Sequence, residues 1–265
     1  MTARLSPAEL AKRLDAAALN ATAIPQLSAS DSLSLGEAHA VQRALVDRRV
    51  ARGERRVGVK LGFTSRAKAA QMGVSDVIIG ELTSGMLVPD GGRLDLGRFV
   101  HPRVEPEVAF RLGRAVSPDE PPHSAVTAIN AVAPALEIID SRYRDFRFSL
   151  PDVIADNTSA AAVVVGRWRP PGTGIGNRGV VLTVDGRAVG FGSTAAILGD
   201  PLRALGAAVR MAASYGLALP AGTVILAGAA TEAVALSAGT VVEAAITGLG
   251  RVTVSVTPAE GSGND

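Results

Sequence analysis

The chain of 265 residues contains no cysteine, and this absence excludes several kinds of site. Without thiols there are no disulfides, zinc–thiolate centres, iron–sulfur clusters or cysteine nucleophiles. Long apolar runs are missing too, since no stretch of about 18 apolar residues occurs. Residues 1–20 carry charges throughout, which is unlike a secretory signal. We therefore expect a cytoplasmic protein without a membrane span.

Aromatic residues are scarce at 3%, and 27 basic residues nearly balance 25 acidic ones. With few rings to stack on bases and little net positive charge, nucleic-acid binding is not expected. Lysine is scarcer still, since it occurs only at Lys12, Lys60 and Lys68 and all other basic residues are arginine. A lysine in such a chain invites a chemical reason, because lysine can change its protonation state when buried and arginine cannot.

The first part of the chain predicts two helices. Ser6 and Ser34 are each followed three residues later by glutamate, which is the pattern of a capping box, and the helices should run to about Leu19 and Arg52. We interpret residues 1–54 as a helical N-terminal segment.

From residue 55 to residue 258 the pattern is dominated by short strands, which we interpret as one catalytic domain, with a flexible tail at 259–265. A hairpin should turn at Asp185-Gly186. Asp200 and Pro201 should begin one of the few helices, which should end near Gly216. Together these patterns predict an α+β protein rich in β-structure.

The stretch GIGNRG at residues 174–179 matches a nucleotide-binding fingerprint, but proline precedes it and a strand follows it. That fingerprint needs a strand before it and a helix after it, so we predict a loop there.

The stretch HPRVEPEVAF at residues 101–110 places two carboxylates on one face of a predicted strand. Side chains alternate along a strand, so Glu105 and Glu107 should share a face at roughly 7 Å separation. Two like charges at that distance repel each other unless a cation lies between them or one is protonated. A divalent cation is one explanation, and a solvated sheet face is the other.

A third carboxylate, Glu137, lies between Leu136 and Ile138 in an apolar run. Three carboxylates on β-structure would form an all-oxygen site, which suits Mg²⁺ or Mn²⁺ better than Zn²⁺. The alternative for Glu137 is an ion pair at a strand edge with Arg142 or Arg144. Asp140 is a competing ligand.

Lys60 lies on the glycine face of the predicted strand RRVGVKLGF, where the absence of side chains leaves room for another group to approach. Partial desolvation near a metal should lower its pKa toward a useful acid–base range. The alternative is a lysine that reaches solvent from the strand edge.

A dense polar stretch, LPDVIADNTSA at residues 150–160, lies between two apolar stretches. These polar residues are either part of a functional site or simply a turn rich in Asp and Asn. The three histidines give no local sign of a Ser-His-Asp arrangement.

Four motifs in this order resemble the 2-keto-4-pentenoate hydratase/4-oxalocrotonate decarboxylase family of the fumarylacetoacetate hydrolase superfamily: GVKLGFTS, HPRVEPEVAF, PALEIIDSRYRDFRFSLPDVIADN and VILAG. The resemblance covers nearly the whole chain. It implies a mixed β-roll with peripheral helices, a homo-oligomer, Mg²⁺ or Mn²⁺ as cofactor and a small 2-oxo acid as substrate.

The resemblance also implies roles for particular residues. The metal ligands would be Glu105, Glu107 and Glu137, and the catalytic lysine would be Lys60. Substrate contacts would come from three further residues: Ser159, Asp156 and Leu61.

The two branches of the family share their metal site, so other stretches must separate them. Hydratases of the family usually carry an aspartate where this chain has Ile78, an apolar residue that cannot position a water; Asp76 is displaced by two residues. The stretches ILAGAATEAV and EIIDSRYRDFRFSLPDVIADN also resemble the decarboxylase branch.

The expected activity is therefore decarboxylation of 2-oxo-3-hexenedioate in meta-cleavage of catechol-type aromatics. Association with the pathway hydratase is a further expectation. A 2-hydroxypenta-2,4-dienoate hydratase is the enzymatic alternative. A catalytically inactive binding or assembly partner is the alternative of another class.

Overall fold

The computed structural model describes residues 4–29, 33–65 and 76–259. The α-helices in these ranges are α1 (Pro7–Leu19), α2 (Leu35–Ala51), α4 (Ala125–Ala128), α5 (Leu150–Ala155) and α6 (Pro201–Tyr215). The strands are β1 (Arg56–Gly62), β2 (Ile78–Thr83), β3 (Leu87–Val88), β4 (Arg93–Asp95), β5 (Arg103–Leu112), β6 (Ile129–Ile139), β7 (Ala160–Val165), β8 (Gly179–Val184), β9 (Arg187–Ser193), β10 (Val224–Ala229), β11 (Val234–Ala235), β12 (Val241–Ile246) and β13 (Gly250–Thr257).

Local signals in the sequence place most of these elements. Ser6 and Ser34 each accept from the amide of the glutamate three residues on and form the predicted capping boxes of α1 and α2. Asp200 caps α6, which ends at the left-handed Gly216 as predicted. Both turn residues between β8 and β9, Asp185 and Gly186, have positive φ, as a tight hairpin turn requires. The GIGNRG stretch is a loop that leads into β8, also as predicted.

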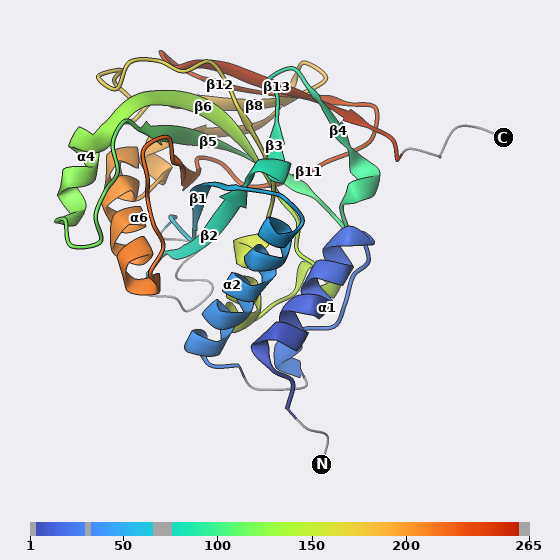
Figure 1. Ribbon diagram of the computed structural model, residues 1–265. Helices are drawn as coiled ribbons and strands as arrows, with labels where there is room; N and C mark the ends of the chain where they lie inside the picture. The colour runs from blue at the N-terminus through green and yellow to red at the C-terminus, as the bar shows by residue number, and fades with distance from the viewer. Residues whose placement is uncertain (1–3, 30–32, 66–75, 260–265) are drawn as a thin grey trace.

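Two mixed sheets form the body of the molecule (Figure 1). The larger has eight strands in the order β2-β1-β10-β5-β6-β7-β3, and β11 pairs with β5 beside this path. The smaller has five strands in the order β4-β13-β12-β8-β9. Parallel pairs join β1 to β10, β3 to β7 and β4 to β13, whereas the other pairs are antiparallel.

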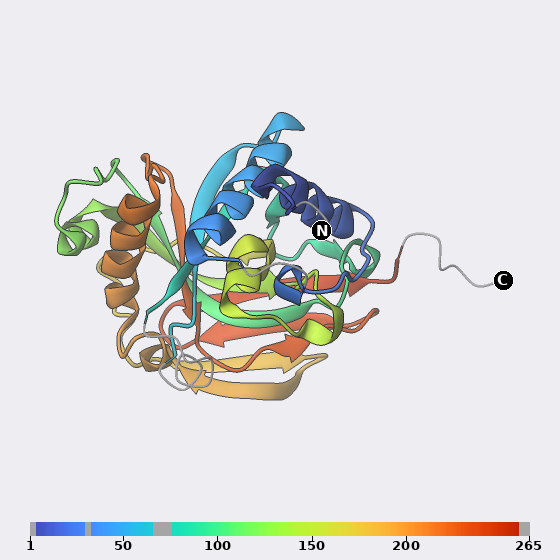
Figure 2. The ribbon, with the colours of Figure 1, turned by 90° about the horizontal axis from the view of Figure 1, so that it is seen from below.

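The two sheets pack face to face through aliphatic side chains. Leu136 and Ile138 of β6 meet Val242 of β12 and Val252 and Val254 of β13, and all of these are buried. Figure 2 shows the strands curling around the interior, with the helices outside them. This is the predicted mixed β-roll with peripheral helices.

The helices cover two different parts of the roll. α6 packs on β1, β5 and β10 through a core that includes Phe110 and Leu205. α1 and α2 lie together on the side away from the five-stranded sheet and pack against α5 and Tyr143 (Figure 1). No helix within the described ranges is long and apolar enough to cross a membrane.

The division into segment 1–54, domain 55–258 and tail 259–265 stays a prediction, and residues 260–265 lie outside the described residues. One local alternative is wrong: the polar stretch 150–160 is more than a turn. Ser149 caps the short helix α5 through a capping box with Asp152, and a distorted 3₁₀ turn at Asn157–Ser159 follows.

Candidate active site

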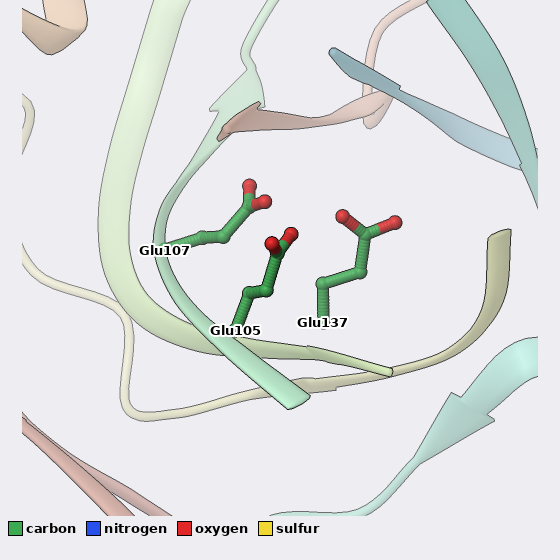
Figure 3. A group of neighbouring side chains, drawn as sticks. All are labelled: Glu105, Glu107 and Glu137. Carbon is green, nitrogen blue, oxygen red and sulfur yellow. The ribbon is translucent and has the colours of Figure 1, made fainter. Parts of the chain in front are cut away.

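Three glutamates converge inside the roll, on one face of β5 and β6 (Figure 3). Glu105 and Glu107 alternate with apolar residues along β5, and the antiparallel register places Glu137 directly opposite Glu105. Directly opposite residues on paired strands point to the same side. One carboxylate oxygen from each of the three residues therefore lies within 4.8 Å of the others.

Burial decides between the two interpretations of this cluster. Glu105 is 7% exposed, and Glu107 and Glu137 are fully buried, so a solvated sheet face is excluded. The alternative partners of Glu137 are excluded too, because Arg142 pairs with Asp156 and Arg144 is exposed. The charged partner of Glu137 is Lys60.

A β-bulge orients Glu107. The pairing of β10 with β5 shifts register between Leu226 and Ala229, and the amide of Gly228 in this bulge donates to Glu107 Oε2 over 2.7 Å. Gly228 has a φ of +106°, and a Cβ at this position would lie 2.1 Å from Thr64 Oγ1. Only glycine fits there, so the bulge fixes one oxygen of Glu107 and leaves the other for a ligand.

Lys60 reaches the cluster from β1. Its Nζ lies 2.9 Å from Glu137 Oε1 and donates to the Thr158 carbonyl over 3.0 Å. The residue is 3% exposed, so it does not reach solvent. Close backbone approach explains the glycines beside it: a Cβ on Gly58 would lie 2.2 Å from the Val224 carbonyl oxygen. The prediction that Lys60 lies on a glycine face that another group approaches is confirmed.

The charges of the cluster perturb one another strongly. Burial raises the pKa of Glu107 well above its ordinary range, the neighbouring Glu137 raises it further, and Lys60 opposes the shift. Burial also raises the pKa of Glu137. Burial lowers the pKa of Lys60, but the attraction of the three carboxylates outweighs it and the net direction is upward. The lowering of the lysine pKa beside a bound metal stays a prediction.

The donor set fits a hard divalent cation. Three ionised carboxylates and one ammonium would carry a net charge of −2 in a buried site, which a divalent ion neutralises. Glu107 Oε1 and Glu137 Oε2 have no hydrogen-bond partner among the described residues, and Glu137 Oε1 contacts the Lys60 ammonium. Buried polar atoms without partners indicate a missing ligand, and oxygen donors without sulfur or imidazole favour Mg²⁺ or Mn²⁺.

The 3₁₀ turn Asn157–Ser159 forms the wall beside Lys60. All three of its residues have positive φ, between 50° and 58°, which is uncommon for residues other than glycine. Hydrogen bonds to β2 hold them: the Asn157 side chain bonds the amide and carbonyl of Glu81, and Thr158 Oγ1 donates to the Ile79 carbonyl. Backbone strain that neighbouring bonds maintain is typical of a functional site.

Ser159 ends this turn with its hydroxyl in the cavity. Its Oγ is buried and has no partner among the described residues, which suits a group that awaits a substrate. Asp156 does not line the cavity. Its carboxylate accepts from the backbone N and from Nε of Arg142, and its carbonyl accepts from the Ser159 amide. Asp156 therefore supports Ser159 from beneath, and nothing in the geometry favours a direct contact with substrate.

The competing ligand Asp140 lies outside the cluster. Its two oxygens accept from the amides of Val100 and His101, so backbone donors already stabilise its charge.

Burial raises the pKa of Asp156 to about 6, against the opposing effect of Arg142.

A cavity of about 550 Å³ opens over Lys60 and Glu105. Leu61 and Ile78 both border it. Leu61 is 1% exposed and packs in the core beneath α6, so its contact with substrate stays a prediction. Asp76 does not border the cavity, and its carboxylate forms an ion pair of 2.7 Å with Arg210 of α6. Of the described residues between 76 and 80, Ile78 is the one that lines the cavity.

Two parts of the site escaped sequence reasoning. The amide of Gly228 is a backbone donor, and the only signal for it is a glycine in a predicted strand, which indicates a bulge or a close approach. The Thr158 carbonyl that accepts from Lys60 depends on the conformation of the 3₁₀ turn, for which the sequence gives no signal.

The geometry agrees with comparisons to known proteins. The family described as fumarylacetoacetate (FAA) hydrolase C-terminal matches residues 57–257. A 4-oxalocrotonate decarboxylase of Pseudomonas sp is 55% identical over 248 residues, which cover 94% of this chain and 97% of that protein. A 2-keto-4-pentenoate hydratase of Paraburkholderia xenovorans (strain LB400) is 36% identical and covers 83% of each chain.

Among solved structures, the 4-oxalocrotonate decarboxylase from Pseudomonas putida G7, complexed with magnesium and adipate, superposes with a TM-score of 0.90. It is 34% identical to this chain, and the match covers 94% of this chain and 97% of that one.

Proposed function

This chain belongs to the fumarylacetoacetate hydrolase family, and on that premise we propose that it decarboxylates 2-oxo-3-hexenedioate (4-oxalocrotonate) to 2-hydroxypenta-2,4-dienoate. The observation that carries the proposal is the buried cluster of Glu105, Glu107 and Glu137 against Lys60 at the floor of a cavity. The similarity to 4-oxalocrotonate decarboxylases supports the substrate, and the magnesium and adipate bound to one of them support the cofactor and a six-carbon diacid.

The metal cofactor, Mg²⁺ or Mn²⁺, would be held by Glu105, Glu107 and Glu137. When bound, it supplies Lewis-acid chemistry, which draws electrons toward the 2-oxo end of the substrate. The Gly228 amide keeps one oxygen of Glu107 in place while the other remains available.

The reaction breaks the C5–C6 bond. Its electron pair forms the C4–C5 double bond, the former C3–C4 pair moves to C2–C3, and the 2-oxo oxygen becomes an enolate as CO₂ leaves. Lys60 holds its ammonium group beside this end of the cavity and donates a proton to the developing enolate oxygen, which gives the 2-hydroxy product. Solvent returns the proton to Lys60. Ser159 orients the substrate from the cavity wall through its free hydroxyl.

Ile78 favours decarboxylation over hydration. A hydratase must hold a water beside C4, and an aliphatic side chain offers that water no hydrogen bond. Asp76, the nearest acidic alternative in sequence, is occupied by Arg210. Hydration of 2-hydroxypenta-2,4-dienoate is the second candidate activity, since relatives named as hydratases also match this chain.

The proposed activity also suggests where the enzyme acts and with which proteins it assembles. We place it in the cytoplasm, in meta-cleavage of aromatic compounds, as a homo-oligomer that associates with the hydratase of the pathway. Such an association would pass on the dienol product before it tautomerises. Sedimentation of the purified protein, alone and mixed with that hydratase, tests both assemblies.

One comparison of substrates tests the activity. The same preparation with Mg²⁺ should release CO₂ from 2-oxo-3-hexenedioate and should hydrate 2-hydroxypenta-2,4-dienoate slowly when that compound is supplied alone. Efficient conversion of the dienoate to 4-hydroxy-2-oxopentanoate without decarboxylation of the diacid would replace this proposal with the hydratase. No metal-dependent turnover of either compound would indicate a catalytically inactive partner.

A further inference from the structure

We propose that Arg103 binds the far carboxylate of the substrate and makes this site selective for dicarboxylates. The inference rests on the proposed function, because it assumes that a 2-oxo acid lies with its oxo end at the glutamate cluster.

The position of Arg103 in β5 is the first support. Arg103, Glu105 and Glu107 occupy alternate positions of one strand and therefore share its face. Each step of two residues spans about 7 Å. Arg103 thus lies at the outer end of a row of three side chains on β5. The two inner ones, Glu105 and Glu107, belong to the metal cluster.

The second support is the cavity itself. Arg103 lines the cavity over Lys60 and Glu105, and among its described lining residues Arg103 is the only arginine. The remaining charged residue of that lining is Glu232, on the exposed rim. No ion pair between Arg103 and Glu232 occurs in the described part of the chain, so the rim acid leaves the guanidinium available.

The third support comes from the contacts of the Arg103 guanidinium. It stacks on Phe146, with its central carbon 4.6 Å from the ring centroid, and this contact limits its orientations. Within the described residues its N–H groups have no acceptor. Arg142 is the opposite case, since Asp156 and nearby carbonyls accept from its guanidinium. An arginine stacked in place with free donors is prepared for a planar anion, which it can bind through two parallel hydrogen bonds.

Substrate length agrees with this arrangement. The two carboxyl carbons of an extended six-carbon diacid are about 6 Å apart, as five carbon–carbon bonds of ~1.5 Å imply. One step of two residues along β5 is of the same size. A substrate held at Glu105 by its oxo end therefore brings its second carboxylate within reach of the Arg103 side chain.

The proposal has a kinetic consequence. The far carboxylate loses its negative charge as it becomes CO₂, so its attraction to Arg103 is stronger in the bound substrate than in the transition state. Such an interaction lowers KM without raising kcat. Removing it should raise KM for 2-oxo-3-hexenedioate and should raise kcat rather than lower it.

A binding cycle with two ligands tests the inference independently of turnover. 2-Oxoadipate and 2-oxohexanoate differ only in the far carboxylate, and calorimetry with saturating Mg²⁺ gives the affinity of each. Arg103→Met should lower the affinity for 2-oxoadipate by roughly 10- to 100-fold, the usual range for a charge-assisted hydrogen-bonded pair. The affinity for 2-oxohexanoate should not change. Arg103→Lys keeps the positive charge but not the planar guanidinium, so it should lose less affinity for 2-oxoadipate than Arg103→Met does. Its affinity for 2-oxohexanoate should again be unchanged.

Arg111→Met is the matched control. Arg111 lies on the same strand and stacks on Trp168 at 5.0 Å, but it does not line the cavity. This variant should bind both ligands as the wild type does. Equal weakening of both ligands by the Arg103 variants would indicate a structural role, and full retention of diacid affinity would mean that another group binds the carboxylate; either result overturns the inference. Failure of the wild type to decarboxylate 2-oxo-3-hexenedioate would instead overturn the proposed function.

Discussion

Two groups of buried carboxylates lie near each other in this protein, and they differ in what surrounds them. The first group consists of Glu105, Glu107 and Glu137. The second consists of Asp140, Asp152 and Asp156. Every carboxylate of the second group accepts at least two hydrogen bonds, from backbone amides, serine hydroxyls or Arg142. In the first group, Glu107 Oε1 and Glu137 Oε2 have no hydrogen-bond partner within the described residues, and the charged partner of Glu137 Oε1 is Lys60.

This difference separates carboxylates that hold the fold from carboxylates that hold a ligand. Burying a charge is costly unless nearby groups stabilise it, and the second group brings those groups with it. The first group places like charges together with one ammonium, an arrangement that a bound divalent cation stabilises. Substitutions in the two groups should therefore affect different properties of the protein.

The largest expected effect is loss of the metal. Glu107→Gln and Glu105→Gln each remove a negative oxygen from a hard-cation site and should abolish Mg²⁺ binding and turnover. The fold should survive, because neutralising a buried acid removes a desolvated charge. Calorimetric titration with Mg²⁺ measures the affinity, and wild-type affinity in both variants would mean that these glutamates are not ligands.

Substitution of Lys60 should affect chemistry with the metal still bound. Lys60→Ala should lower kcat by about 10²- to 10⁴-fold, the range for a general acid or base, and Mg²⁺ binding should persist. Lys60→Arg should not restore activity, since arginine cannot release a proton near neutral pH. An arginine variant with full activity would show that the position requires only positive charge.

Substitution in the second group should affect stability alone. The Asp152 carboxylate accepts from the amide and hydroxyl of both Ser28 and Ser149, at 2.6–3.0 Å. Asp152→Ala removes the capping box of α5 and leaves these donors without their acceptor, at a cost of about 3 kcal/mol in the free energy of unfolding. Urea denaturation measures this loss, and Mg²⁺ affinity is the control that should not change. A fall in metal affinity without a loss of stability would reverse the assignment of the two groups.

The response to pH should separate the groups in the metal-free protein. Glu107, Glu137 and Asp156 have pKa values raised by burial, so the folded protein binds more protons than the unfolded chain above about pH 4. The free energy of unfolding should therefore fall as pH rises from about 4 through 6 and beyond. Saturating Mg²⁺ should remove the contribution of the two glutamates and leave that of Asp156.

Urea denaturation between pH 4.5 and 7.5, with EDTA or with Mg²⁺, gives the difference between the two slopes. Contributions from all other residues cancel in that difference. Equal slopes in the two conditions would contradict a metal site at the glutamates.

The smallest expected effect concerns Ser159. Its hydroxyl has no partner among the described residues, so Ser159→Ala should leave the free energy of unfolding within about 0.5 kcal/mol of the wild type. Loss of one hydrogen bond to substrate should lower kcat/KM by about tenfold. A variant with unchanged kinetics would show that Ser159 does not contact the substrate.

Sequence reasoning reached the parts of the molecule that local patterns determine. The capping boxes at Ser6 and Ser34 and the turn at Asp185-Gly186 depend on neighbouring residues only. The shared face of Glu105 and Glu107 follows from the period of a strand.

Other features depend on contacts that are distant in sequence. The contact between Glu137 and Glu105 requires the register of β5 and β6, which the spacing alone did not predict. The family resemblance supplied the grouping of the three glutamates as metal ligands. The direction of the Lys60 pKa required the sum of three carboxylates. Arg103 was not distinguishable among the many arginines until the cavity was defined.

The central claim is that Glu105, Glu107 and Glu137 hold the metal, and anomalous scattering tests it most directly. Crystals of the wild-type protein with Mn²⁺ should show one anomalous peak between the carboxylates of Glu105, Glu107 and Glu137, and crystals of Glu107→Gln grown in the same way should show none there. A peak at Asp140, Asp152 or Asp156, or no peak at the glutamates of a wild-type protein that is active with Mn²⁺, would contradict the account.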